Sequence, residues 1–185
     1  ESDWLNRNGT NFASWYRFLS QEHQDKTIDL TNNLRDILPG FHAFKLETAG
    51  KHRILKVGFL NGKKSEPVYF DFEQISDGQR TMIVLYSLLL SLQDLGHTLF
   101  LDEPENYLAL PEIQPWLMEL NNACGEDFPQ AVLISHHPEL IDYLGPECGK
   151  WIDRDPLGPT RVKSLPTKIE KNLKLSEQIA RGWTE

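Results

Sequence analysis

The first forty residues place apolar side chains at helical spacing. In Asn11–Ser20 the apolar residues recur every three or four positions, and Thr27–Leu38 repeats the pattern. This spacing lines up the apolar side chains along one face of a helix. Pro39-Gly40 should end the second segment, because proline cannot continue a helix. The pattern therefore predicts two amphipathic helices at the start of the chain.

The next thirty residues change to a strand pattern. Phe44–Glu47, Arg53–Leu60 and Pro67–Phe72 are rich in β-branched and aromatic residues, and Asn61-Gly62 separates the last two. Asn-Gly is a favoured two-residue turn of β-hairpins. We expect the three strands to form an antiparallel meander.

From residue 75 onward, helices and strands alternate. A long apolar helix over about Gln79–Leu95 leads to the strand Thr98–Leu101, and a helix over about Pro111–Cys124 leads to the strand Ala131–Ser135. Both strands are continuous apolar runs, which is typical of strands covered on both faces of a parallel sheet. A strand–helix–strand unit of this length implies a right-handed crossover.

The end of the chain predicts a closing hairpin and one more helix. Trp151–Asp153 and Arg161–Leu165 flank a Pro- and Gly-containing turn, and a last helix is expected near Lys168–Arg181. The change of pattern divides the chain into residues 1–74, with two helices and antiparallel strands, and residues 75–185, with the α/β part.

Composition and charge narrow the class of protein. The 185 residues are 39% hydrophobic and 25% charged, as in ordinary folded domains. The net charge of -8 repels nucleic acid on average, and no cluster of basic residues stands out. Any contact with DNA is therefore expected through parts outside this chain. No apolar run approaches the roughly 18 residues of a membrane span, so we expect no membrane partner.

The cysteines and the first residue add two further expectations. Cys124 and Cys148 lie far apart without the spacing of a metal site, so a reducing cytoplasm is the default location, and a single disulfide stays open. The chain begins at Glu1 rather than at methionine, and we expect that a segment has been removed before it.

Chemistry-bearing side chains follow each predicted parallel strand. Asp102 and Glu103 come directly after the first strand, and His136 follows the second. Ligands of open α/β sheets bind at this carboxyl edge. Phosphoryl transfer from ATP needs a bound metal, a group that positions water and donors for the developing charge. Asp102 suits the role of a magnesium ligand, and Glu103 suits the role of the general base. His136 could contact the γ-phosphate.

A third segment, Ser76-Asp77-Gly78-Gln79, lies directly before the long apolar helix. Backbone N–H groups at a helix N-terminus form an anion site, and Gly78 allows the backbone to approach a ligand closely. The Ser-x-x-Gln spacing also fits a capping box that merely begins a helix. Each of the three segments has such an ordinary explanation by itself, but their order and spacing together favour a nucleotide site.

Together these segments resemble the ABC ATPase superfamily. Ser76–Gln79 is similar to a variant of its LSGGQ signature, Leu99–Glu103 to its Walker B strand, and Ser135-His136 to its switch-histidine loop. Asp77 replaces the first signature glycine, as RecF-like members tolerate. The segment Asn106–Leu110 departs from the D-loop of transporters, which disfavours a transporter.

Within the superfamily, the chain resembles the RecF-like, OLD-like and SMC-related AAA family ATPases of DNA repair and phage defence. The residues that carry this resemblance are Asp102–Asn106, followed by a leucine-rich turn and proline, and Ser135–Leu140. The resemblance implies an α/β fold with a P-loop NTPase-like parallel sheet and flanking helices, beside the antiparallel β meander.

The phosphate-binding P-loop of these ATPases has no counterpart here. No G-x-x-x-x-G-K-[ST] occurs, and Gly62-Lys63-Lys64-Ser65 lies in a hairpin turn with its upstream glycine at the wrong spacing. The chain is therefore identified as the carboxy-terminal half of an ATPase head, inactive alone. In the family, ATP and Mg²⁺ bind a site that the partner's signature completes, which implies a homodimer.

Three functions follow from these expectations. The first is a dimeric ATPase of DNA repair or phage-defence type that drives DNA transactions or gates an associated nuclease. The second is an ATP-dependent dimerisation switch with little turnover that regulates an effector such as a nuclease. The third is an interaction domain with a degenerate site. ATP-dependent dimerisation and turnover distinguish the three.

Overall fold

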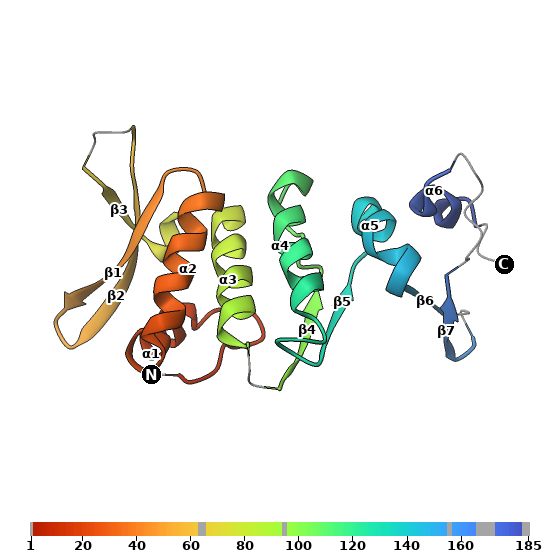
Figure 1. The fold of residues 1–185 in the computed structure, drawn as a ribbon, viewed down its shortest axis with the longest axis horizontal. Coiled ribbons are helices and arrows are strands. Elements are labelled where there is room, and N and C mark those ends of the chain that lie inside the picture. Colours follow the sequence, from red (N-terminus) through yellow and green to blue (C-terminus); the bar gives the residue numbers. More distant parts are fainter. Residues whose placement is uncertain (1, 63–65, 94–95, 155–156, 166–172, 183–185) are drawn as a thin grey trace. The chain divides into compact units, whose positions relative to one another are not determined.

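The computed structural model describes residues 2–62, 66–93, 96–154, 157–165 and 173–182 (Figure 1). These residues form two compact units, Glu1–Val132 and Leu133–Glu185. We describe each unit by itself. The division between residues 74 and 75 that the sequence pattern suggests stays a prediction.

Two amphipathic helices open the first unit, as predicted. The helix α1 spans Phe12–Glu22 and buries its aromatic face, and α2 spans Gln24–Ile37. Leu30 and Leu34 of α2 are almost fully buried, so the apolar stripe seen in the sequence faces the core. The N–H of Leu38 donates to the carbonyl of Leu34 at 2.9 Å and closes the last turn before Pro39.

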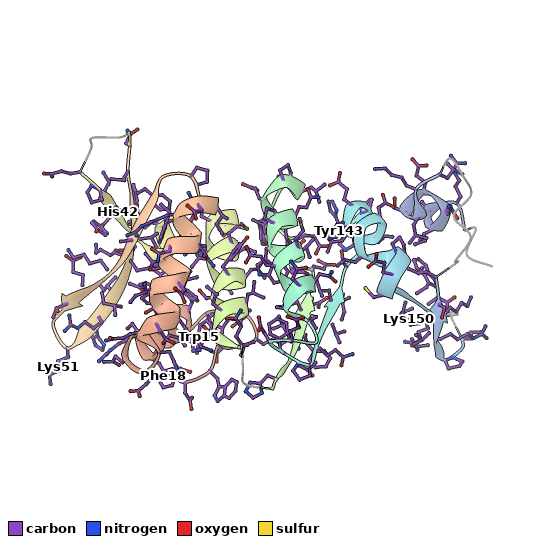
Figure 2. The ribbon with its side chains drawn as sticks, in the orientation of Figure 1. Trp15, Phe18, His42, Lys51, Tyr143 and Lys150 are labelled. Atoms are coloured by element: carbon purple, nitrogen blue, oxygen red, sulfur yellow. The ribbon has the colours of Figure 1, made fainter. Side chains whose placement is uncertain are left out.

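The predicted meander is confirmed. Strands β1 (Phe41–Ala49), β2 (His52–Phe59) and β3 (Val68–Asp71) form an antiparallel sheet in that order. Figure 2 shows Lys51 at the tip of the hairpin between β1 and β2. Residues 63–65, which follow the predicted Asn61-Gly62 turn, lie outside the described residues. The sheet packs on the helices, with the rings of Tyr16 and Phe44 at a centroid distance of 4.6 Å.

A short 3₁₀ turn, η1 (Phe72–Gln74), leads from the sheet to α3 (Asp77–Ser91). The helix α3 is the apolar helix of the sequence prediction, and it packs against α2 and α4. Ile83, Tyr86 and Ser87 are fully buried. The Ser87 hydroxyl is satisfied inside the helix, because it donates to the carbonyl of Ile83 at 2.6 Å. The long helix thus forms the centre of the first unit.

The strands β4 (Thr98–Asp102) and β5 (Gln130–Ile134) form a two-stranded parallel sheet, and α4 (Leu110–Ala123) connects them. This confirms the α/β unit. The expectation that both faces are covered is not met by the described residues, since Phe100 is 72% exposed and Ile134 is 57% exposed. Leu99, which points to the other face of β4, is buried. The apolar run therefore marks a sheet with one uncovered face in this chain.

The second unit contains α5 (Pro138–Cys148), β6 (Lys150–Arg154), β7 (Thr160–Ser164) and α6 (Leu175–Ala180). The predicted closing hairpin is confirmed, with Ile152 opposite Val162. The sequence pattern missed α5. The early part of the last predicted helix lies in 166–172, outside the described residues.

Two further findings concern the cysteines and the length of the helices. Cys124 and Cys148 are free thiols, so the disulfide that the sequence left open is not formed. Among the described helices, none is long and apolar enough to cross a membrane.

Candidate functional site

The signature-like segment begins α3 through reciprocal hydrogen bonds. The Gln79 N–H donates to the Ser76 hydroxyl oxygen at 3.2 Å, and the Ser76 N–H donates to the Gln79 side-chain oxygen at 3.1 Å. The capping box is therefore formed in this structure. Ser76 and Asp77 remain exposed at the helix start. Asp77 forms an ion pair with Arg80, one turn further along α3.

Gly78 lies where the start of α3 meets the segment that follows β4. A Cβ atom at Gly78 would lie 2.7 Å from the carbonyl oxygen of Tyr107, closer than real Cβ atoms come to other atoms. Glycine was expected from the sequence to admit a ligand, but the close neighbour in the structure is this backbone carbonyl. The absence of a side chain at residue 78 lets the two segments touch.

The segment after β4 holds the two predicted acids. Asp102 ends the strand and is exposed, whereas Glu103 is half-buried and has a φ of +48°. The Asn106 side-chain amide donates to Glu103 Oε2 at 2.9 Å, and the Asn106 N–H donates to the Glu103 carbonyl at 3.1 Å. Tyr107 has a φ of +70° and is 74% exposed. Two non-glycine residues in the left-handed region within five positions are uncommon and typical of functional segments.

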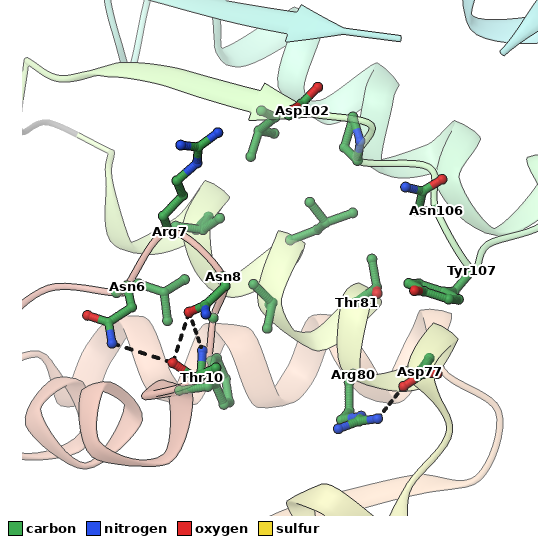
Figure 3. Close-up of a pocket in the computed structure, with 18 of the residues that line it drawn as sticks. Asn6, Arg7, Asn8, Thr10, Asp77, Arg80, Thr81, Asp102, Asn106 and Tyr107 are labelled. Carbon is green, nitrogen blue, oxygen red and sulfur yellow. Dashed lines mark hydrogen bonds and ion pairs between the residues drawn. The ribbon is translucent and has the colours of Figure 1, made fainter. Parts of the chain in front are cut away.

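A cavity of about 580 Å³ brings three of the predicted site residues together (Figure 3). Its wall includes Asp77 from α3, and Asp102 and Glu103 from the end of β4. The lining also includes apolar residues such as Phe12 and Leu88. A lining that combines apolar side chains with a few polar ones is usual for a ligand site. Ser76, Gly78 and Gln79 do not line this cavity.

The predicted switch histidine lies in the second unit. His136 follows β5 and is exposed. The neighbouring residues begin α5, since the His137 N–H donates to the Ser135 hydroxyl oxygen at 3.0 Å and the Glu139 N–H donates to His137 Nδ1 at 3.3 Å. His137 thus caps the N-terminus of α5. The convergence of His136 with Glu103 stays a prediction.

Two residues of the site were missed by sequence reasoning. Asn106 was noted only as part of the Asp102–Asn106 motif, without a role. Arg7 lines the cavity from the N-terminal loop, and no motif marks it. The spacing of Asn106, three residues after Glu103, is the signal that could have revealed a turn with a side-chain contact.

The residues present fit magnesium held jointly with nucleotide phosphates. Among the described residues, no group of three or more His, Cys, Asp or Glu side chains could hold a metal alone. Magnesium at phosphate sites uses one or two carboxylates and completes its coordination with phosphate oxygens and water. The exposed carboxylate of Asp102 at the cavity wall suits that role. A dedicated metal centre would not fit these residues.

The fold and the family assign the chain to the nucleotide-binding ATPase class. It belongs to the AAA domain family described as "AAA domain, putative AbiEii toxin, Type IV TA system", which matches residues 5–142. No curated protein matches the chain. These findings confirm the predicted AAA family at the level of the domain.

A solved structure shares the fold over nearly the whole length of both chains. It comes from work described as "Structural biochemistry of ATP-driven dimerization and DNA stimulated activation of SMC ATPases". The TM-score is 0.58 at 12% sequence identity, and the match covers 91% of this chain and 97% of that chain. The resemblance to SMC-related ATPases is therefore confirmed for the fold.

Proposed function

We propose that this chain provides one part of a magnesium-dependent ATP site that two copies of the protein share, and that the assembled protein hydrolyses ATP. The observation that carries the proposal is the cavity that Asp102 and Glu103 line at the carboxyl end of β4. Membership of an AAA domain family supports the nucleotide.

The roles follow from the chemistry of each side chain. Bound Mg²⁺–ATP would supply the electrophilic γ-phosphoryl group. Asp102 at the strand end would bind the metal. Glu103 would accept the proton of the attacking water, and the amide of Asn106 would orient its carboxylate. His136 would donate to the γ-phosphate.

The signature segment would act on the partner's nucleotide. The N-terminus of α3 offers backbone N–H groups and a positive dipole end, both of which favour phosphate. Ser76, Asp77, Gly78 and Gln79 begin this helix, and Ser76 and Asp77 are exposed. The likeness to a structure studied for ATP-driven dimerisation of SMC ATPases supports a homodimer. A phosphate-binding loop outside this sequence would complete the site.

The biological setting extends the same proposal. The family description names toxin–antitoxin systems, which favours defence against phage over DNA repair. An effector such as a nuclease would respond to the ATP-driven dimer, and DNA would bind through parts outside this chain. Free thiols at Cys124 and Cys148 agree with a cytoplasmic location.

The test is steady-state ATP hydrolysis with Mg²⁺ by the natural protein, together with the segment that supplies the phosphate-binding loop. Glu103→Gln should abolish turnover and still bind ATP. Glu126→Gln is the matched control, because Glu126 is exposed in a loop away from the cavity. Unchanged turnover in Glu103→Gln would remove the assignment. If no variant hydrolyses ATP but all dimerise with it, the dimerisation switch replaces the ATPase.

A further inference from the structure

The lining of the cavity includes a cation as well as acids. Asp102 and Glu103 contribute one side, and Arg7 contributes another from the loop before α1. Figure 3 shows the Arg7 side chain extending from this loop toward the end of β4 that bears Asp102. We propose that Arg7 binds the terminal phosphate of the nucleotide in this cavity. This inference rests on the proposed function and adds a phosphate-binding residue that the sequence motifs lack.

The charge of the cavity favours this role for Arg7. Both cations on the wall are arginines, Arg7 and Arg80. Arg80 is neutralised by its ion pair with Asp77. Among the residues that the structure describes, Arg7 makes no ion pair. A triphosphate brings several negative charges next to Asp102 and Glu103, so a cation in the cavity lining would favour its binding.

The loop that carries Arg7 is held by its own hydrogen bonds. Asn8 Oδ1 accepts hydrogen bonds from the Thr10 N–H at 3.3 Å and the Thr10 hydroxyl at 2.9 Å. The Asn6 N–H donates to Asn11 Oδ1 at 2.7 Å, which joins the loop to the start of α1. Arg7 lies between these two anchors with its side chain exposed. The backbone is thus fixed while the guanidinium remains available to a ligand.

The guanidinium is well suited to bind a terminal phosphate. Its planar group of donors matches two phosphate oxygens at once, and such charge-assisted pairs are stronger than neutral hydrogen bonds. Asp102 would hold magnesium, which would neutralise part of the phosphate charge. Arg7 would contact the phosphate that ADP lacks. The expected ligand is therefore a nucleoside triphosphate rather than a diphosphate.

The test is the dissociation constant of Mg²⁺–ATP and of Mg²⁺–ADP for the natural protein and its variants. Arg7→Gln should weaken ATP binding by about tenfold or more and leave ADP binding within about twofold. Arg7→Lys should retain part of the ATP affinity, because lysine keeps the positive charge but lacks the planar set of donors of the guanidinium. Arg53→Gln is the matched control, since Arg53 is exposed on β2 and does not line the cavity.

Each other outcome has one meaning. Equal loss of ATP and ADP affinity, or no loss, would overturn the assignment of Arg7. Loss of double-stranded DNA binding with unchanged ATP affinity would also overturn it, and would place Arg7 on a nucleic-acid surface. Failure of the unaltered protein to bind ATP would instead refute the proposed function. An unchanged melting temperature of Arg7→Gln shows that the comparison concerns binding and not folding.

Discussion

Replacing Gly78 by alanine tests the contact between the start of α3 and the segment after β4. The new Cβ would lie 2.7 Å from the Tyr107 carbonyl oxygen, so the backbone must move by at least a few tenths of an ångström. That oxygen belongs to the backbone, in a segment fixed by the Asn106 hydrogen bonds, and cannot swing away as a side chain would. The substitution therefore strains the contact between residue 78 and the Tyr107 carbonyl.

Two opposing terms decide the magnitude. Alanine in place of glycine inside a helix gains about 0.5–1 kcal/mol. Forcing an extra methyl group into a filled space costs about 1–3 kcal/mol. We expect a net loss of up to about 2.5 kcal/mol. For a chain of this size, that loss lowers the melting temperature by up to about 10 °C.

Thermal unfolding followed by circular dichroism measures this change. Asn121→Ala is the control, because Asn121 is exposed in α4 and its replacement adds helix propensity without a close contact. It should leave the melting temperature equal or slightly higher. A melting temperature of Gly78→Ala that rises by as much as the gain in helix propensity alone predicts would show that the close contact has no energetic weight.

Two further predictions concern the site and the core. Asn106→Ala should lower kcat by about tenfold with little change in KM, because the amide that orients Glu103 is lost; an unchanged kcat would contradict the positioning role. Burial raises the pKa of Tyr16 from 10.0 to about 12, so the folded state favours the neutral phenol. Stability from this group is complete below pH 10 and is lost as the pH rises toward 12. Tyr16→Phe should therefore unfold less readily than the natural protein in that window, as measured by urea titration, and a parallel decline of both proteins would refute the assignment.

The sequence predicted the elements whose apolar pattern is long or tightly bounded. The helix α3 was recognised because apolar residues fill most of its positions, and the strand β4 because its apolar run is continuous and ends at Asp102. The helix α5 was missed because Gly145 and Pro146 lie inside it, and both residues normally interrupt a helix. A prediction based on the apolar pattern therefore fails for a short helix that contains proline and glycine near its end.

The candidate site was predictable only in part. Asp102 and Glu103 were recognised because they follow an apolar strand. The end of that strand determines their position at the edge of the sheet. Arg7 could not be found, because its loop reaches the cavity through tertiary packing and not through a periodic pattern. The contact between Gly78 and the Tyr107 carbonyl joins residues 29 positions apart, and no local pattern reports such a contact.

A mixing experiment tests most directly whether two copies share each ATP site. One variant carries Glu103→Gln and the other carries Ser76→Arg, and each should be inactive alone. In a mixed dimer, one site combines both changes, while the other has an intact Glu103 from one copy and an intact Ser76 from its partner. With random pairing, the mixture should recover about a quarter of the natural ATP hydrolysis. Recovery would support the shared site, and a mixture as inactive as its components would contradict it.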